Sequence, residues 1–221
     1  MSKDDHGHDH GHDHPEGNSE AVHVGTHANV EPSPYARRVA ALELLLEQKG
    51  VIQRSDVQKA WDQKISRSPS DGAKVVARAW TDPAFKARLL ANPRAAVGEL
   101  GYQIESKVTD ISIVENTDQV HHMVVCTLCS CYPSMLLGPA PDWYKSLAYR
   151  SRAVSDPRGV MREFGLNLDK DIEVRVLDST ADLRYMVVPR RPEGTEGWSE
   201  EELAALVTRD SMIGVTDALA P

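Results

Sequence analysis

Regular spacing of apolar positions begins at Tyr35. Between Tyr35 and Lys49 apolar residues recur every three or four positions, the repeat of one helix face, and Gly50 is typical of a helix end. The apolar face would consist of Val39, Leu42, Leu45 and Leu46. The pattern predicts an amphipathic helical arm with one side suited to packing on another surface.

Four further helices are predicted before Gly101. Their expected ranges are 55–63, 70–80, 83–91 and 93–100. Asp82-Pro83 and Asn92-Pro93 each offer a side-chain oxygen at the N-cap and a proline at the first helical position, where its missing N–H is not needed. We therefore expect residues 34–101 to form a helical segment.

After Gly101 the pattern changes to short runs rich in β-branched residues. These runs predict strands over residues 111–114, 122–125, 172–177 and 185–188. The second of them leads directly into a stretch that contains all the cysteines of the chain. Side chains that follow a strand end are held firmly, so this stretch is a strong candidate for a functional site.

Helices are also expected among these strands. Asp156-Pro157 predicts a capped helix that ends near Gly165, and Ser199 with Glu202 forms a capping box for a helix through Val207. The fold class is therefore α+β. We expect an N-terminal helical arm and helices, followed over residues 102–221 by a layered α/β domain around the cysteine loop.

Residues 1–33 form a separate compositional zone. Seven of the nine histidines lie here, interleaved with aspartates and glycines. Such a composition cannot build a core, so we expect a disordered tail. The tail is either a reservoir that collects divalent metal to load a metal site or a solvated extension without that role.

Composition and charge narrow the class of protein. A net charge of -8 and a pI near 5.6 argue against nucleic-acid binding. No apolar run has the length of a membrane span or of a signal-peptide core, so we expect no membrane association and a cytoplasmic protein. Only 5% of the residues are aromatic. This small supply favours a chain that completes its packing on a partner.

The cysteines themselves indicate a metal site. An odd number of thiols, Cys126, Cys129 and Cys131, excludes a disulfide framework. If Cys129 and Cys131 bind one metal, the amide nitrogens of Ser130 and Cys131 fall inside small chelate rings and become ligands too. Cys126 can then cap one face of this plane and leave the other face open. Thiolates and amides suit a trivalent low-spin ion, Co(III) or Fe(III).

Other interpretations of the cluster are open. His121 and His122 precede it and could complete a Cys-and-His zinc site. An iron–sulfur cluster normally needs four cysteines, and thiols at this density are prone to oxidise if no metal binds them. After the cysteines, Pro133, Pro139 and Pro141 are expected to keep the chain irregular and short of helix, so that it can curl around a metal.

The cysteine stretch, Val-Cys-Thr-Leu-Cys-Ser-Cys-Tyr-Pro over residues 125–133, resembles the α subunit of cobalt-type nitrile hydratase. The related metal-bearing subunit of thiocyanate hydrolase shares the motif. The resemblance extends from about Pro34 onward. It includes Asp-Trp-Tyr-Lys-Ser at 142–146, Arg-Pro-Glu-Gly-Thr-Glu-Gly-Trp at 191–198 and Thr-Arg-Asp-Ser-Met-Ile-Gly-Val at 208–215.

The resemblance implies a cofactor and a modified site. In that family threonine at the position of Thr127 accompanies cobalt, whereas serine accompanies iron, so it implies one Co(III) per chain with iron less favoured. It also implies that Cys129 becomes a sulfinic acid and Cys131 a sulfenic acid, while Cys126 stays a thiolate. Cys131, Cys129 and Ser130 would be the catalytic residues, and Cys126, Cys129, Ser130 and Cys131 the metal ligands.

The resemblance further implies a partner and a reaction. The arm at 35–49 would wrap a β subunit, two arginines of which would pair with the oxidised cysteines, so the chain alone would be inactive. The reaction would be hydration of a nitrile to the corresponding amide. Whether water on the metal or the Cys131 sulfenate attacks first stays open.

Two alternative functions are kept. The chain could be the metal-bearing subunit of thiocyanate hydrolase, or a non-enzymatic metal carrier with loosely held metal. Ser134 departs from both enzyme patterns, because many nitrile hydratases have tryptophan there and thiocyanate hydrolase tends to have arginine. A neutral serine counts against an anionic substrate and favours a roomier or more polar pocket for nitriles.

Overall fold

The computed structural model describes residues 33–104 and 108–221, and it leaves out the side chains of residues 60, 61 and 63–65. The disorder expected for the histidine-rich tail falls on residues 1–32, outside this range. The chain forms two compact units, Met1–Ile52 and Gln53–Pro221. The domain boundaries predicted at residues 33 and 101 stay predictions.

The described part of the first unit contains one helix, α1, Pro34–Gln48. It begins where Ser33 Oγ accepts a hydrogen bond from the Ala36 N–H at 3.1 Å, and it is followed by Gly50 with a φ of 67°. The predicted helix is confirmed. None of its residues is buried, and Val39 and Leu42 on its apolar face are 55% and 56% exposed. The apolar face therefore has no cover within the described part of the first unit.

The second unit starts with the predicted helices. They are α2 Arg54–Ser66, α3 Pro69–Thr81, α4 Pro83–Ala91 and α5 Pro93–Glu99. Both predicted N-caps are confirmed: Asp82 Oδ1 accepts from the Phe85 N–H at 2.9 Å and Asn92 Oδ1 from the Ala95 N–H at 3.2 Å. The two Asx-Pro pairs thus set the helix starts from local chemistry alone.

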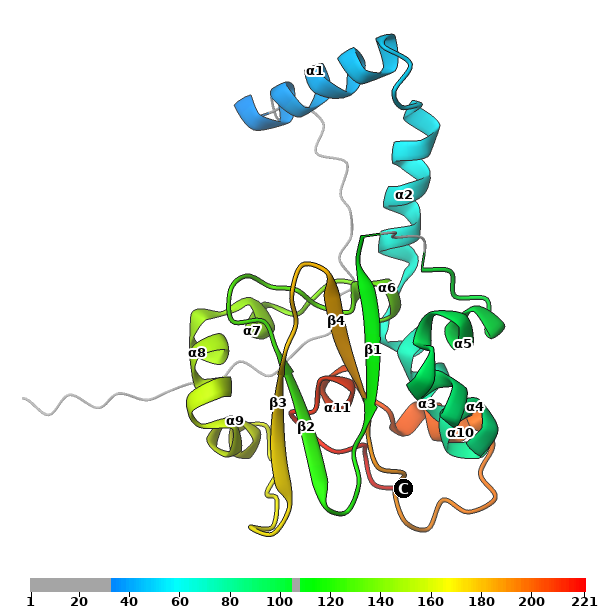
Figure 1. Ribbon diagram of the computed structural model, residues 1–221, viewed down its shortest axis with the longest axis vertical. Coiled ribbons are helices and arrows are strands. Elements are labelled where there is room, and N and C mark those ends of the chain that lie inside the picture. The colour runs from blue at the N-terminus through cyan, green and yellow to red at the C-terminus, as the bar shows by residue number, and fades with distance from the viewer. Residues whose placement is uncertain (1–32, 105–107) are drawn as a thin grey trace, which may run out of the picture. The chain divides into compact units, whose positions relative to one another are not determined.

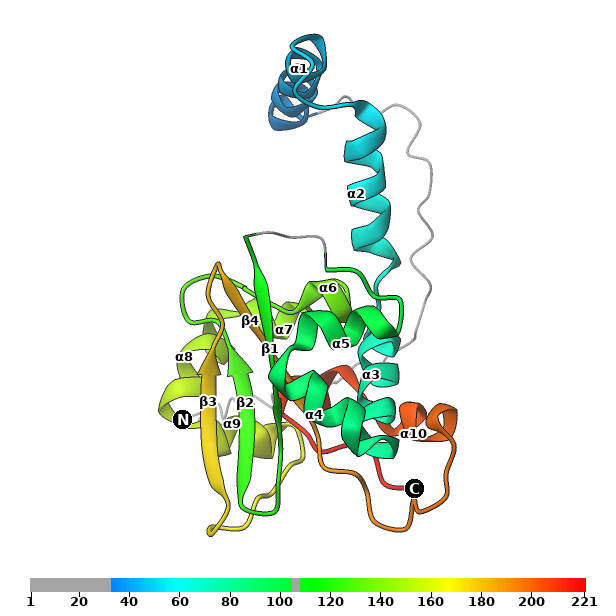
Figure 2. The ribbon, with the colours of Figure 1, turned by 45° about the vertical axis from the view of Figure 1, so that its right-hand side comes forward.

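All four predicted strands are present, and they form two parallel pairs. β1 Asp110–Glu115 pairs with β4 Leu183–Val188, and β2 Val120–Val125 pairs with β3 Glu173–Asp178. Helices α3, α4, α5 and α10 (Glu200–Leu206) lie on one side of the strands, and α8 (Leu147–Ser155) and α9 (Pro157–Glu163) on the other (Figures 1 and 2). This mixed helix and strand arrangement is the predicted α+β fold.

The register of β2 on β3 determines where the cysteine loop emerges. Val125 stands opposite Asp178 at the carboxyl ends of the two parallel strands. The loop therefore leaves the sheet beside the end of β3, and polar groups after that strand can reach it. Functional groups gather at this end of parallel strands in many α/β proteins.

One prediction about the following segment is wrong. Residues 133–141 were expected to stay short of helix, but Ser134–Leu137 form a single helical turn, α6. Pro133 does not prevent it, because it occupies the N-cap position, where no intrahelical N–H is required. Gly138, with a φ of 68°, ends the turn. Proline thus bounds this helix without breaking it.

Three further helices, besides α6, were not predicted from the sequence. They are α7 Asp142–Lys145, α8 and α11 Arg209–Ile213. Caps that could have indicated two of them are present: Ser146 Oγ accepts from the Tyr149 N–H at 3.1 Å, and Thr208 forms a capping box with Ser211. The predicted helices α9 and α10 are confirmed with their caps.

Two glycines allow elements around the cysteine loop to approach closely. A Cβ on Gly72 of α3 would lie 2.3 Å from Leu137 Cδ2 of α6. A Cβ on Gly214, which ends α11 with a φ of 81°, would lie 1.9 Å from the His122 carbonyl oxygen in β2. A larger residue at Gly214 would push α11 away from β2, the strand that leads to the loop, whereas at Gly72 it would first displace the flexible end of the Leu137 side chain.

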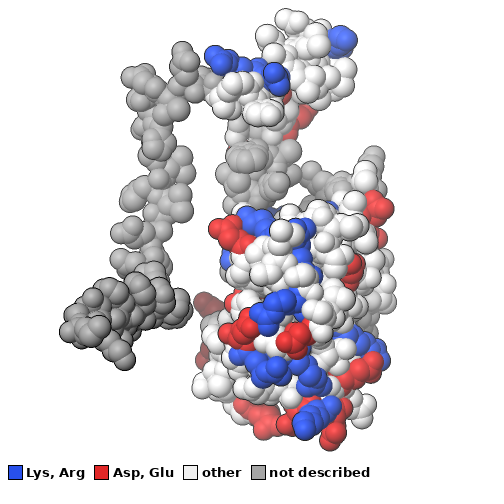
Figure 3. All heavy atoms as spheres, turned by 90° about the vertical axis from the view of Figure 1, so that its left-hand side faces the viewer, with Lys and Arg blue, Asp and Glu red and all other residues white. Residues whose placement is uncertain are grey.

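Basic and acidic side chains are interleaved on the face seen in Figure 3. Elsewhere in the described chain such side chains form ion pairs, for example Arg152–Glu163 at 2.6 Å and Arg175–Glu173 at 3.0 Å. Within the described ranges, none of the helices combines the length and the apolar character that a membrane crossing requires.

Candidate metal centre

The strand end before the cysteine loop is anchored on two sides. Tyr149 OH of α8 donates to the Val124 carbonyl at 2.6 Å, and the Ser179 N–H after β3 donates to the Val125 carbonyl at 2.7 Å. These bonds satisfy the backbone where the strand ladder stops. Cys126 therefore starts from a fixed position.

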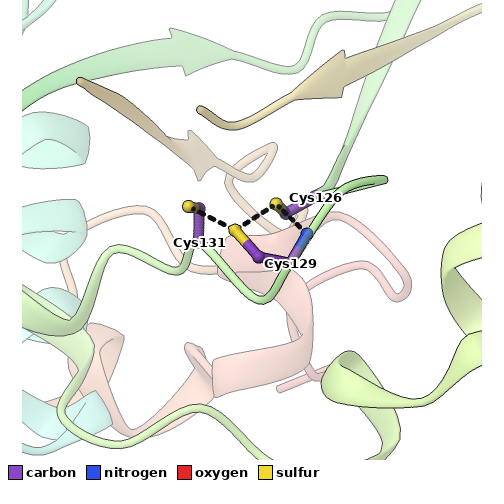
Figure 4. A group of neighbouring side chains, drawn as sticks. All are labelled: Cys126, Cys129 and Cys131. Atoms are coloured by element: carbon purple, nitrogen blue, oxygen red, sulfur yellow. Dashed lines mark hydrogen bonds between the residues drawn. The ribbon is translucent and has the colours of Figure 1, made fainter. Parts of the chain in front are cut away.

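The structure brings the three cysteines together. The sulfur of Cys129 lies 3.3 Å from that of Cys126 and 2.9 Å from that of Cys131 (Figure 4). All three sulfurs lie within 4.8 Å of one another. Cys126 and Cys131 are buried, whereas Cys129 is exposed. The group thus has a closed side toward the sheet and an open side toward solvent.

Backbone N–H groups also face the sulfurs. The Cys129 N–H donates to Cys126 Sγ at 3.3 Å, and the backbone N–H groups of Ser130 and Cys131 help to lower the pKa of the Cys129 thiol. These two amides therefore lie beside the Cys129 sulfur, next to the place where a shared ion would bind. Soft sulfur and amide nitrogen are the donors that suit a low-spin transition metal, so the residues present fit such an ion.

The three thiols differ in acidity in the metal-free chain. Hydrogen bonds from Cys131, and then from Cys126, lower the pKa of Cys129 to about 7. Burial, and then hydrogen bonding with Cys129 and Cys126, raise the pKa of Cys131 to about 12, against the opposing charge of Arg184. Since the thiolate is the ligand form, the exposed Cys129 is the first of this pair to offer an ionised sulfur.

The two histidines do not join the cysteines. Asn116 Nδ2 lies 3.1 Å from His121 Nδ1, and His121 Nε2 lies 2.8 Å from the Gly214 carbonyl oxygen. His122 lies against Asn116 through both its backbone N–H and its Nδ1. Burial lowers the pKa of both imidazoles. Among the described residues, the candidate metal ligands that cluster are the three cysteines alone, so the Cys-and-His zinc site is not formed.

Contacts from distant elements support the loop. Thr127 donates through its N–H to Asp178 Oδ1 at 3.0 Å and through its hydroxyl to Asp178 Oδ2 at 2.6 Å. Tyr144 OH donates to the Cys131 carbonyl at 2.8 Å, and Arg150 Nη1 to the Cys129 carbonyl at 2.7 Å. These bonds fix the loop on either side of Ser130.

The three supporting residues were missed in the sequence. A signal existed for Asp178, because it directly follows the predicted strand over 172–177, at the end where functional groups collect. No spacing connects Tyr144 or Arg150 to the cysteines. Ser134, which sequence comparison with the family singled out, begins α6 and is half-buried.

Comparison with known proteins agrees with this geometry. Residues 33–216 match the family model described as nitrile hydratase, alpha chain. The chain is 51% identical over 191 residues to the high-molecular weight cobalt-containing nitrile hydratase subunit alpha of Rhodococcus rhodochrous. This match covers 85% of this chain and 93% of that protein. It is 37% identical over 202 residues to thiocyanate hydrolase subunit gamma of Thiobacillus thioparus, covering 84% of this chain and 83% of that protein.

A solved structure is similar as well. A double mutant of the Fe-type nitrile hydratase from Comamonas testosteroni Ni1 superposes with a TM-score of 0.73 at 44% identity, over 87% of this chain and 94% of that one. The family match spans the helical segment, both strand pairs and the cysteine loop. With its three sulfurs gathered at the end of β2, the chain belongs to the nitrile hydratase alpha-chain family.

Proposed function

We propose that this chain is the catalytic α subunit of a cobalt nitrile hydratase, which adds water to a nitrile to give the corresponding amide. It would work in the cytoplasm with a β subunit. The metal ligands would be the sulfurs of Cys126, Cys129 and Cys131 and the amide nitrogens of Ser130 and Cys131. The single observation that carries the proposal is the convergence of the three cysteine sulfurs, which all lie within 4.8 Å of one another.

Cobalt is the preferred ion for two reasons. Thr127 occupies the position that accompanies cobalt in the family, and the Rhodococcus relative is named cobalt-containing. When bound, trivalent cobalt would supply a Lewis acid that polarises the nitrile or acidifies water. Cys126 would hold this ion together with the sulfurs and amide nitrogens supplied by Cys129, Ser130 and Cys131.

The residues of the loop would then have separate roles. Cys129 and Cys131 would carry sulfinic and sulfenic oxygens, and the Cys131 oxygen would take a proton from the attacking water or attack the nitrile carbon itself. Buried Cys131 lies on the closed side of the cluster, and the exposed Cys129 on the open side. Thr127 and Asp178 would keep the first half of the loop in place.

A partner subunit is part of the proposal. The uncovered apolar face of α1 suits a protein surface, and Leu128 in the cysteine loop is 91% exposed. A β subunit would cover both and supply the two arginines expected to pair with the cysteine oxygens. The chain alone would therefore be inactive.

The test uses the full chain co-expressed with its β subunit in medium containing cobalt. We expect about one cobalt per chain, a loop peptide that carries two extra oxygens on Cys129 and one on Cys131, and conversion of butyronitrile to butyramide. Zinc with unmodified thiols, or metal that exchanges readily with a chelator, would favour the metal-carrier alternative.

Thiocyanate hydrolysis is the second candidate, favoured by the 37% identity to the Thiobacillus subunit. Ser134 speaks against it, because a neutral side chain gives an anion no charge partner. The same preparation should be assayed with thiocyanate beside butyronitrile. A higher kcat/KM for thiocyanate would replace the proposed function with this one.

A further inference from the structure

Arg150 differs from Arg152, the other arginine on its helix. Arg152, two residues further along α8, forms ion pairs with Glu163 at 2.6 Å and Asp156 at 3.9 Å. Arg150 instead donates from Nη1 to the carbonyl oxygen of Cys129 at 2.7 Å. A side chain 21 residues away in sequence therefore holds the centre of the cysteine loop.

The bonded oxygen shares a peptide plane with a proposed ligand. In a trans peptide the carbonyl oxygen of one residue and the N–H of the next point in opposite directions. When Arg150 draws the Cys129 oxygen toward α8, the Ser130 N–H is turned the other way, away from α8. The guanidinium thus sets the orientation of the Ser130 nitrogen.

The support behind Arg150 is rigid. The preceding residue, Tyr149, packs edge-on against Trp143 with ring centroids 4.8 Å apart, and its hydroxyl bonds to the Val124 carbonyl just before the loop. The strand end and the loop centre are therefore both attached to one turn of α8. A helix fixed in this way holds a planar guanidinium with little freedom to reorient.

Arg150 also has an unused donor. Its Nε is buried without a hydrogen-bond partner in the described chain. A guanidinium beside an anionic centre would contribute its charge as well as its carbonyl contact.

We propose that Arg150 is a positioning residue for the metal centre, which orients the Ser130 amide nitrogen toward the ion and balances part of the negative charge of the sulfur and amide ligands. This proposal rests on the proposed function, because Ser130 matters in this way only if its nitrogen binds the metal. It assigns to this chain one cationic support of the loop, in addition to those expected from the partner.

The test compares Arg150→Gln with Arg152→Gln in the full chain co-expressed with its β subunit and loaded with cobalt. Both variants remove one positive charge from α8, but only the first removes the contact to Cys129. We expect Arg150→Gln to lose cobalt to EDTA about 10-fold to 100-fold faster than wild type, and its sulfur-to-cobalt charge-transfer band to shift. Arg152→Gln should match wild type in both.

The lysine variants cover the case in which Arg150→Gln does not fold. Arg150→Lys keeps the charge but not the planar fork, so it should release cobalt at a rate between wild type and Arg150→Gln, while Arg152→Lys stays at the wild-type rate. If the Arg150 variants match the Arg152 variants in release rate and spectrum, the proposal is wrong. If wild type itself holds no cobalt, the proposed function fails instead.

Discussion

The cysteine loop and helix α1 are built in opposite ways. The loop is irregular and partly exposed, yet side chains from β3, α7 and α8 bind its backbone at Thr127, Cys131 and Cys129. Helix α1 is regular and has a sound N-cap, yet no residue in it is buried. Regular secondary structure is therefore no guide to where this chain is held by its own fold.

The two regions meet different requirements, those of a metal site in the loop and those of an assembly surface in α1. A metal site needs donors fixed to within a fraction of their bond lengths, and only tertiary contacts hold an irregular loop so closely. An amphipathic helix forms its surface from local sequence, but it gains most of its stability only when a second surface covers the apolar face. Substitutions in the loop should therefore be harmful even in the isolated chain. Substitutions on the apolar face of α1 should be harmful only in the complex.

The largest expected effect comes from removing a sulfur. Cys126→Ala takes away the proposed capping ligand, so cobalt content and nitrile hydration should both fall below detection. Metal analysis of the purified complex tests this. Leu128→Ala in the same loop is the matched control and should keep its cobalt, because a leucine side chain has no atom that can ligate a metal. Full cobalt occupancy in Cys126→Ala would contradict the ligand assignment.

A smaller effect is expected from a charge on the apolar face of α1. Leu42→Asp should leave the unfolding free energy of the isolated chain within about 0.5 kcal/mol of wild type, because the side chain is exposed there. Association with the β subunit should weaken roughly tenfold or more if that face is buried in the complex. Titration calorimetry measures the affinity.

The control for this helix is Arg37→Gln. Arg37 lies on the far side of α1 from Leu42 by helical spacing and is exposed, so its affinity for the β subunit should not change. Equal affinities for Leu42→Asp and Arg37→Gln would mean that the apolar face is not the contact surface.

The smallest expected effect is a loss of stability in acid that is confined to the second unit. Burial lowers the pKa of His121 and His122 in the folded chain. The unfolded chain therefore binds more protons than the folded chain once the pH falls below the ordinary histidine pKa of ~6.5. The stability that the neutral pair provides is therefore lost as the pH falls from there toward their folded pKa values. Residues 34–48 contain no histidine, so α1 does not share this dependence.

Hydrogen exchange at pH 7.5 and 5.5, corrected for intrinsic rates, tests this difference. Protection in β2 should decrease at the lower pH, while that of α1 should not change in step. In His122→Gln the decrease should be smaller, because one of the two titrating groups is gone. Equal protection of β2 at both pH values in the wild-type chain would count against the prediction.

Much of the fold could be predicted because the deciding interactions are local. Asp82 and Asn92 bond to N–H groups three residues on, and the strands follow from runs of β-branched residues. The proline prediction after the cysteines failed, because a proline at a helix start and one inside a helix look the same in sequence. Only the path of the chain distinguishes them.

By itself the sequence determined which candidate donors lie together along the chain. Cys126, Cys129 and Cys131 lie so close along the chain that their sulfurs and the amides between them can meet in one short loop. Tertiary structure alone decided what holds that loop and what stays away from it. Asp178 reaches Thr127 from 51 residues along the chain, and His121 binds Gly214 across 93 residues, away from the sulfurs. Contacts over such separations depend on strand register and helix packing, which no local pattern encodes.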